Sequence, residues 1–184
     1  MKLLLFGNAS AARLLHCAFE LRLSHEQFQQ FVDGFHDDTV LLNPSVQISS
    51  LVLAPPRAAE AHLSRPNDES LVIKISYGVT SALLEGDAEK KTEKQVAQEN
   101  PQADLLKVAH HGSSTSTIPE LLAAVQPKFA VISVGGRNVY GHPRLEVLER
   151  LEEAHVRTYR TDMNGAVTFY LDGKTVSSPL AALH

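Results

Sequence analysis

The sequence predicts an α/β protein built on a mixed sheet with flanking helices. From about residue 70, short apolar runs alternate with segments of helical periodicity, which is the pattern of strands connected by helices. Turn signals at Gly78 and at Asp172-Gly173 predict two hairpins, which add antiparallel pairs to the sheet. Together these observations favour a sheet with both parallel and antiparallel neighbours.

Composition sets limits on the class of protein. The chain has 184 residues, 43% of them hydrophobic, which is enough for one globular domain. A net charge of −4 argues against a broad basic surface for nucleic acid, and the single Cys17 excludes an intramolecular disulfide or a cysteine zinc cluster. No apolar run is long enough for a signal peptide or a membrane span, so we expect a soluble chain without an indicated compartment.

The first 40 residues differ from the rest. Apolar residues at helical spacing over residues 11–23 predict one helix, and Ser24 is a candidate N-cap for a second helix that ends near Gly34. We therefore divide the chain into a divergent helical segment, residues 1–40, and an α/β domain, residues 41–184.

The expected elements of the α/β domain follow from apolar runs and their boundaries. Pro55-Pro56 ends a strand, Pro119 opens a helix after Ser116 and Thr117, and Pro143 opens another helix. The predicted strands are 46–53, 70–77, 81–86, 104–109, 128–134, 156–160, 165–171 and 174–178, and the predicted helices are 88–98, 118–126 and 143–154.

Three segments place polar side chains at the ends of apolar runs. The string KVAHHGSS, residues 107–114, contains His110 and His111; the string LLEGDA, residues 83–88, contains Asp87; and the string NVYGHP, residues 138–143, contains His142. Carboxylate and imidazole donors at consecutive strand ends are a common way to build a metal site on a β-rich scaffold.

These segments belong to six blocks that together resemble the metallo-β-lactamase-fold domain at the C-terminal end of ComEC-type competence proteins. The blocks run in the family's order, at residues 67–73, 83–88, 107–113, 130–135, 138–143 and 159–166. The resemblance implies an αββα sandwich, of which this chain matches the second half, and a dinuclear metal site that hydrolyses phosphodiester bonds.

Two departures from the family pattern concern the metal ligands. The H-x-H-x-D-H string, which supplies most ligands of the first metal in that fold, is absent from this sequence. Ala54 precedes the Pro-Pro pair where the family usually has a liganding histidine. The chain therefore keeps the second half of the site and lacks the first half.

The resemblance assigns metal-binding roles to Asp87 and His111. Asp87 matches the carboxylate that bridges two metals, although an ordinary helix N-cap would also explain an aspartate there. His111 is the expected ligand of the histidine pair. His110, one residue earlier on a strand, should point the other way and contact the substrate or support the site.

The remaining candidates would act on the substrate. His142 is a candidate substrate contact or proton donor to the leaving oxygen, or else a turn histidine packed on Tyr140. Ser113 and Ser114 would bind a phosphate oxygen or simply cap their loop. Asp162 would support the site, by resemblance alone.

Two interpretations of function follow. In the first, the chain is a metal-dependent hydrolase that binds zinc or manganese weakly and cleaves single-stranded DNA or another phosphodiester. A partner chain, or residues of the N-terminal segment, would then supply the missing half-site. In the second, it is a degenerate, non-catalytic or truncated module with a structural or a phosphate- or nucleotide-binding role. A regulatory binding protein that uses the remaining cleft is a third class, supported only by Ser113 and Ser114.

Overall fold

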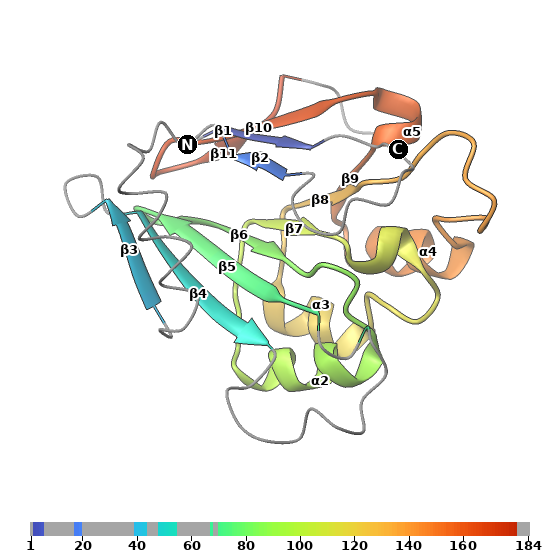
Figure 1. The fold of residues 1–184 in the computed structure, drawn as a ribbon, viewed down its shortest axis with the longest axis horizontal. Coiled ribbons are helices and arrows are strands. Elements are labelled where there is room, and N and C mark those ends of the chain that lie inside the picture. The colour runs from blue at the N-terminus through green and yellow to red at the C-terminus, as the bar shows by residue number, and fades with distance from the viewer. Residues whose placement is uncertain are drawn as a thin grey trace.

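The computed structural model describes residues 2–5, 17–19, 39–43, 48–54, 67 and 70–179. Two sheets are present in this part of the chain, one of seven strands and one of four (Figure 1). The larger sheet contains, in spatial order, β3 (Thr39–Asn43), β4 (Ile48–Ala54), β5 (Val72–Tyr77), β6 (Thr80–Leu84), β7 (Leu105–Lys107), β8 (Phe129–Ile132) and β9 (Arg157–Arg160).

The larger sheet is mixed, as the sequence predicts. Its strands from β3 to β6 are antiparallel neighbours, and its strands from β6 to β9 are parallel neighbours. The parallel strands are connected by α2 (Lys90–Gln98), α3 (Pro119–Val125) and α4 (Leu145–Glu153). This arrangement confirms the α/β class.

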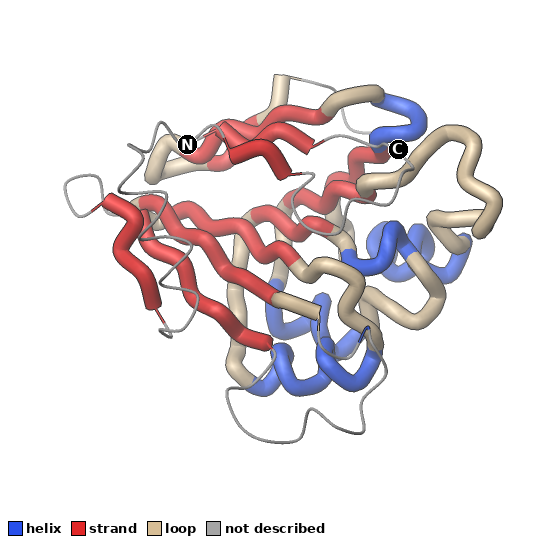
Figure 2. Tube along the Cα trace, in the orientation of Figure 1, coloured by secondary structure: helices blue, strands red, loops and turns tan. Residues whose placement is uncertain are grey.

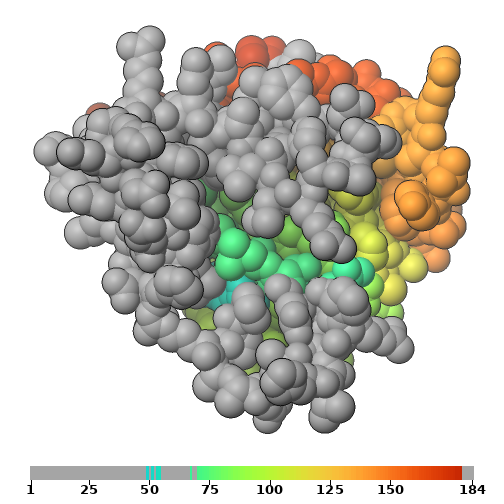
Figure 3. Space-filling model, in the orientation of Figure 1, coloured from blue at the N-terminus to red at the C-terminus, as the bar shows by residue number. Residues whose placement is uncertain are grey.

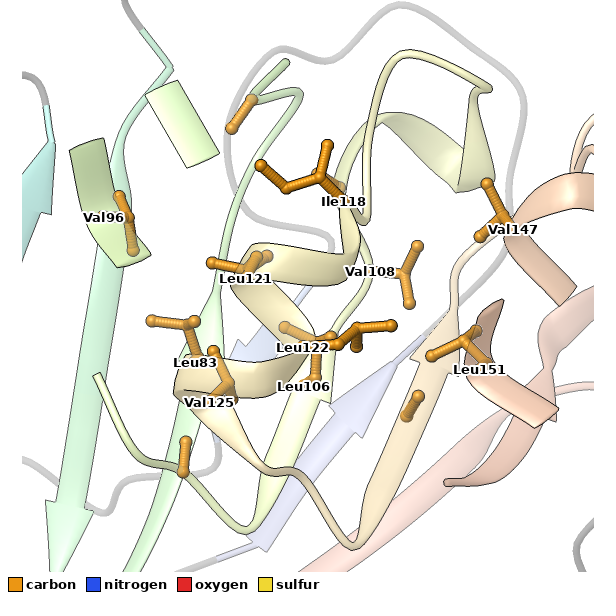
Figure 4. Packing of buried hydrophobic residues seen from close by; sticks show 14 of the residues in the cluster. Leu83, Val96, Leu106, Val108, Ile118, Leu121, Leu122, Val125, Val147 and Leu151 are labelled. Atoms are coloured by element: carbon orange, nitrogen blue, oxygen red, sulfur yellow. The ribbon is translucent and has the colours of Figure 1, made fainter. Parts of the chain in front are cut away.

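Helices cover one face of the larger sheet. Val96 of α2, Leu121 of α3 and Leu151 of α4 are buried in one core with Leu83 and Leu106 of the sheet (Figure 4). Side chains from three helices thus converge on the central strands, and this packing fixes where the loops at the strand ends lie.

The smaller sheet covers the other face (Figure 2). It consists of β11 (Val176–Ser177), β10 (Val167–Leu171), β1 (Lys2–Leu5) and β2 (Cys17–Phe19), all antiparallel. Phe169 of β10 packs in a second core with Leu84, Leu105 and Val131 of the larger sheet. Strands β6 to β8 are therefore buried on both faces, which explains why they are continuous apolar runs in the sequence.

Several features of the described residues differ from the sequence prediction. Strand β2 lies inside residues 11–23, where a helix was predicted, and β1 pairs with β10 in the smaller sheet. The other residues of both predicted N-terminal helices lie outside the described part of the chain. A short helix, α5 (Thr161–Asn164), follows β9.

No helix in the described residues is long and apolar enough to cross a bilayer.

Candidate functional site

The candidate site lies at the carboxyl ends of the parallel strands. Strand β6 ends at Leu84 and leads to Asp87, while β7 ends at Lys107 and leads to a short 3-10 helix, Ala109–Gly112. Backbone hydrogen bonds join these connections: the His110 amide donates to the Gly86 carbonyl at 3.0 Å, and the Arg144 amide donates to the Gly112 carbonyl at 2.8 Å. Three loops far apart in the sequence thus meet at one edge of the sheet.

Asp87 and His111 face each other in this site. Asp87 Oδ1 lies 3.9 Å from His111 Nε2, and each side chain is about half exposed, at 51%. Helix α2 begins at Lys90 with Glu89 as its N-cap, so Asp87 is not the helix cap considered from the sequence. Its carboxylate is turned toward the histidine instead.

The tautomer of His111 follows from its second ring nitrogen. His111 Nδ1 lies 2.5 Å from the Ser133 carbonyl oxygen, and because a carbonyl only accepts, Nδ1 carries the proton. Nε2 is then unprotonated in the neutral ring and presents its lone pair on the Asp87 side. A histidine held by a backbone carbonyl in this way is typical of metal ligands.

His110 does not lie on a strand, contrary to the sequence prediction. Strand β7 ends at Lys107, and both His110 and His111 have left-handed backbone conformations, with φ of 46° and 55°. The alternation of side chains along a strand therefore does not apply to this pair. His110 Nδ1 lies 3.5 Å from Glu89 Oε1, and its ring packs edge-on against His142 at 5.9 Å.

His142 sits in a loop that its own hydrogen bonds hold in place. The Asn138 side chain accepts from the His142 amide at 2.9 Å and donates to the His142 carbonyl at 2.9 Å. The His142 ring is nearly parallel to that of Tyr140, with centroids 6.0 Å apart. Burial lowers the pKa of His142, and His110, Arg144 and His111 lower it further. His142 thus contacts both Tyr140 and the histidine pair.

The serines of the candidate site differ in their surroundings. Ser113 is 7% exposed, and its hydroxyl lies 3.0 Å from the Thr115 hydroxyl and accepts a hydrogen bond from the Thr115 amide. These contacts cap the loop, which is one of the two roles expected from the sequence. Ser114 is half-buried.

Ser116 fixes the backbone of the strained histidine pair. Its hydroxyl is positioned to donate to the Ala109 carbonyl at 3.1 Å and to the Ser113 carbonyl at 2.9 Å. Left-handed conformations cost energy in residues other than glycine, so such a pair persists only where its surroundings hold it. In the sequence, Ser116 is recognisable only as part of a helix-start signal.

A buried carboxylate and an arginine hold the next part of that loop. The Glu93 carboxylate, fully buried on α2, accepts hydrogen bonds from the amides of Thr117 and Ile118 at 2.5 and 2.8 Å. Arg150 Nη1 on α4 donates to the carbonyls of Ser116 and Thr117 at 3.0 and 3.4 Å. We call these contacts the Glu93–Arg150 clamp. The spacing of Glu93 and Val96 on one helix face was a signal for this burial.

Glu85 is a second buried carboxyl group, two residues before Asp87. It is 0% exposed, and neither carboxyl oxygen has a hydrogen-bond partner among the described residues. Burial raises the pKa of Glu85 well above its ordinary value, the Glu93 charge raises it further, and Lys107 lowers it. Burial without partners therefore favours the neutral form of the Glu85 carboxyl group, which had no predicted role.

Asp162 and Ala54 are held by contacts of their own. Asp162 is in α5, where both its carboxylate oxygens accept from Arg160 at 3.1 and 2.7 Å. Ala54 ends β4 and is completely buried in the helix-side core. The position where the family usually has a liganding histidine is thus filled by an apolar side chain.

The described residues fit a divalent metal only in part. Asp87 and His111 form a carboxylate–imidazole pair with suitable chemistry, and the carbonyl-held tautomer of His111 suits a ligand. No group of three or more histidine, cysteine or acidic side chains able to hold a metal occurs within the part of the chain that the structure describes. Two donors make an open and weak site.

Comparison with known proteins shows that part of this chain is related to segments of longer proteins. No protein-family model matches it. It is 44% identical over 105 residues to ComE operon protein 3 of Bacillus subtilis, which is 56% of this chain and 14% of that protein. It is 42% identical over 101 residues to Recombination protein 2 of Haemophilus influenzae, covering 55% of this chain and 13% of that protein.

A third relative matches a similar share of this chain. Competence protein ComA of Neisseria gonorrhoeae is 35% identical over 108 residues, covering 57% of this chain and 16% of that protein. The chain thus spans about a seventh of the length of these curated relatives. Somewhat more than half of this chain is therefore homologous to a short segment of ComEC-type competence proteins.

Proposed function

We propose that this chain represents part of a metallo-β-lactamase-like domain that acts on phosphodiester bonds in DNA uptake. In this proposal Asp87 and His111 form the second half of a dinuclear metal site. The observation that supports it most directly is the 3.9 Å approach of Asp87 Oδ1 to His111 Nε2, with Ser133 setting the histidine tautomer. The homology to competence proteins supports a role in DNA uptake, and we propose single-stranded DNA or another phosphodiester as the substrate.

A bound zinc or manganese ion would supply an acidified water as the nucleophile. Asp87 and His111 would hold the ion, and the Ser133 carbonyl accepts the Nδ1 proton of His111, which leaves Nε2 available as a ligand. The lowered pKa of His142 favours its neutral ring near neutral pH. We propose that His142 contacts the substrate or exchanges a proton with the leaving oxygen.

A second function, a degenerate module without catalysis, is favoured by Ala54. That residue ends β4 and is fully buried, so it offers no donor where the resemblance places a ligand. In this alternative the fold would serve a structural role or bind a phosphate or nucleotide. The missing half-site would otherwise have to come from a partner chain or from residues outside the described part.

Calorimetric titration with zinc and manganese tests the metal site. We expect the wild-type chain to bind no more tightly than micromolar, because two protein ligands leave most of the coordination sphere to water. His111→Ala should abolish this binding. His155→Ala is the matched control, since His155 is exposed and precedes β9, at the opposite end of the parallel strands.

The titration separates the two functions. Weak binding lost only in His111→Ala supports the half-site, and no binding by the wild type supports the degenerate module. Tight stoichiometric binding would contradict both, because it requires further ligands.

A further inference from the structure

The loop between β8 and α4 presents an exposed aromatic ring beside the histidines of the candidate site. In Figure 1 this loop projects, in orange, from the right-hand side of the molecule, and orange atoms stand out at the same edge in Figure 3. Tyr140 is 71% exposed and the preceding Val139 is 90% exposed. Exposed large apolar side chains in a folded chain are most informative when they cluster next to a site.

The exposed ring is continuous with the site. Tyr140 lies nearly parallel to His142, at an interplanar angle of 17°, and His142 in turn packs edge-on against His110. Three rings thus lead from solvent to the histidine pair. A flat ligand that stacks on the free face of Tyr140 would extend this series of rings.

The loop is positively charged and preorganised. Residues 135–145 contain Arg137 and Arg144 and no acidic residue, in a chain whose net charge is −4. Both arginines are exposed, and Arg144 together with the histidines lowers the pKa of His142. The Asn138 side chain holds the loop through Gly135 and His142, so little ordering is needed on binding.

We propose that Tyr140 is a stacking platform for a nucleobase of a single-stranded nucleic acid, with Arg137 and Arg144 binding the adjacent phosphates. An aromatic face flanked by arginines is the combination that single-stranded nucleic acids require, because every base has a π-face and every linkage a charge. The inference rests on the proposed function and adds the residues that select a polynucleotide over a small phosphodiester.

The test compares two labelled twelve-residue oligonucleotides by fluorescence anisotropy at low salt, one of thymidines and one with abasic spacers. Both present the same phosphates, but only the first offers bases. We expect Tyr140→Ala to weaken binding of the thymidine strand by about fivefold or more. Its binding of the abasic strand should not change, and Tyr140→Phe should retain the affinity for thymidine.

A spectroscopic signature accompanies the binding assay. The chain has no tryptophan and four tyrosines, so tyrosine emission can be followed directly. Stacking should quench part of this emission when the thymidine strand binds, and Tyr140→Phe should lose that quenching while keeping the affinity. Tyr170→Ala, at a half-exposed tyrosine on β10, is the control and should behave as wild type.

The outcomes are distinguishable. If the wild type prefers the thymidine strand and Tyr140→Ala keeps that preference, Tyr140 is not a stacking platform. Equal binding of both strands by the wild type would lead to the same conclusion. Either result would leave the proposed function standing. Binding of neither strand by the wild type would overturn the proposed action on nucleic acid and this inference with it.

Discussion

At the scale of single residues, Gly112 determines how closely two site loops approach. It has φ of +82°, and a Cβ atom there would lie 2.6 Å from Pro143 Cβ and 3.1 Å from Pro143 Cα. Its carbonyl also accepts the Arg144 amide. The His110–His111 turn and the His142 loop can meet only because this position has no side chain.

Gly112→Ala should therefore destabilise the chain. Gly165→Ala is the matched control, because Gly165 has a similar φ of +69° but no atom within 4 Å of the added Cβ. We expect the free energy of unfolding to fall by about 1–3 kcal/mol more in the Gly112 variant than in the control, because the added methyl group overpacks the contact with Pro143. Urea unfolding of both variants measures the difference. Equal losses would show that the loops separate without cost.

The buried carboxyl groups predict a dependence of stability on pH. Burial raises the pKa of Glu93 from 4.5 to about 7, and the pKa of Glu85 is also raised. A raised folded-state pKa gives stability that is fully present below pH 4.5 and is lost as pH rises through the folded pKa. His142, whose pKa is lowered, contributes the opposite slope.

We therefore compare the pH dependence of the free energy of unfolding in the wild type and in Glu85→Gln, because His142 contributes equally to both. The wild type should lose more stability than the variant between pH 5 and pH 8, by a few kcal/mol at most, because one pKa unit corresponds to about 1.4 kcal/mol. Urea unfolding across this range measures it, with the exposed Glu149→Gln as control. Parallel curves for wild type and Glu85→Gln would contradict the assignment.

At the scale of elements, the Glu93–Arg150 clamp connects α2 and α4 to the loop that carries the histidine pair. Arg150→Met should cost about 1–3 kcal/mol, because the Ser116 and Thr117 carbonyls lose their donor and Glu93 loses a nearby positive charge. Glu153→Met on the same helix is exposed and serves as the control. Thermal unfolding should separate the two, and a loss no larger than that of the control would show that the clamp is dispensable.

The elements also show what the sequence could predict. The strands β5 to β8 and the helices α2 to α4 were predicted within a few residues, because buried apolar runs and proline signals mark them. The pairing of β1 with β10 was not, since a four-residue strand carries almost no pattern of its own. Burial of Glu93 was missed because a charged residue in a helix is normally read as solvent-facing.

Within the site, sequence reasoning could identify candidates but not their geometry. It paired Asp87 with His111, and the two lie 3.9 Å apart. It placed His110 on a strand, whereas positive φ values turn both histidines out of the strand geometry. Such conformations depend on contacts from Ser116 and distant helices, which no local pattern contains.

At the scale of the whole molecule, both faces of the larger sheet are covered, and the candidate site residues lie at one edge of that sheet. The helices occupy one face of the larger sheet and the smaller sheet occupies the other, so the loops at the carboxyl ends of the parallel strands remain accessible. This is where ligands bind in open α/β sheets. We propose that the described residues at this edge, Asp87 and His111, contribute half of a metal site.

Hydrolysis of single-stranded DNA and of a chromogenic phosphodiester, with manganese present, tests this claim most directly. The wild-type chain and Asp87→Ala should both remain near background, because without a complete pair of ions the pKa of the attacking water is not lowered toward neutrality. Asp172→Ala, at an exposed turn, is the control for an unrelated loss of charge. A robust wild-type rate that survives in Asp172→Ala and vanishes in Asp87→Ala would contradict the half-site and show a complete one.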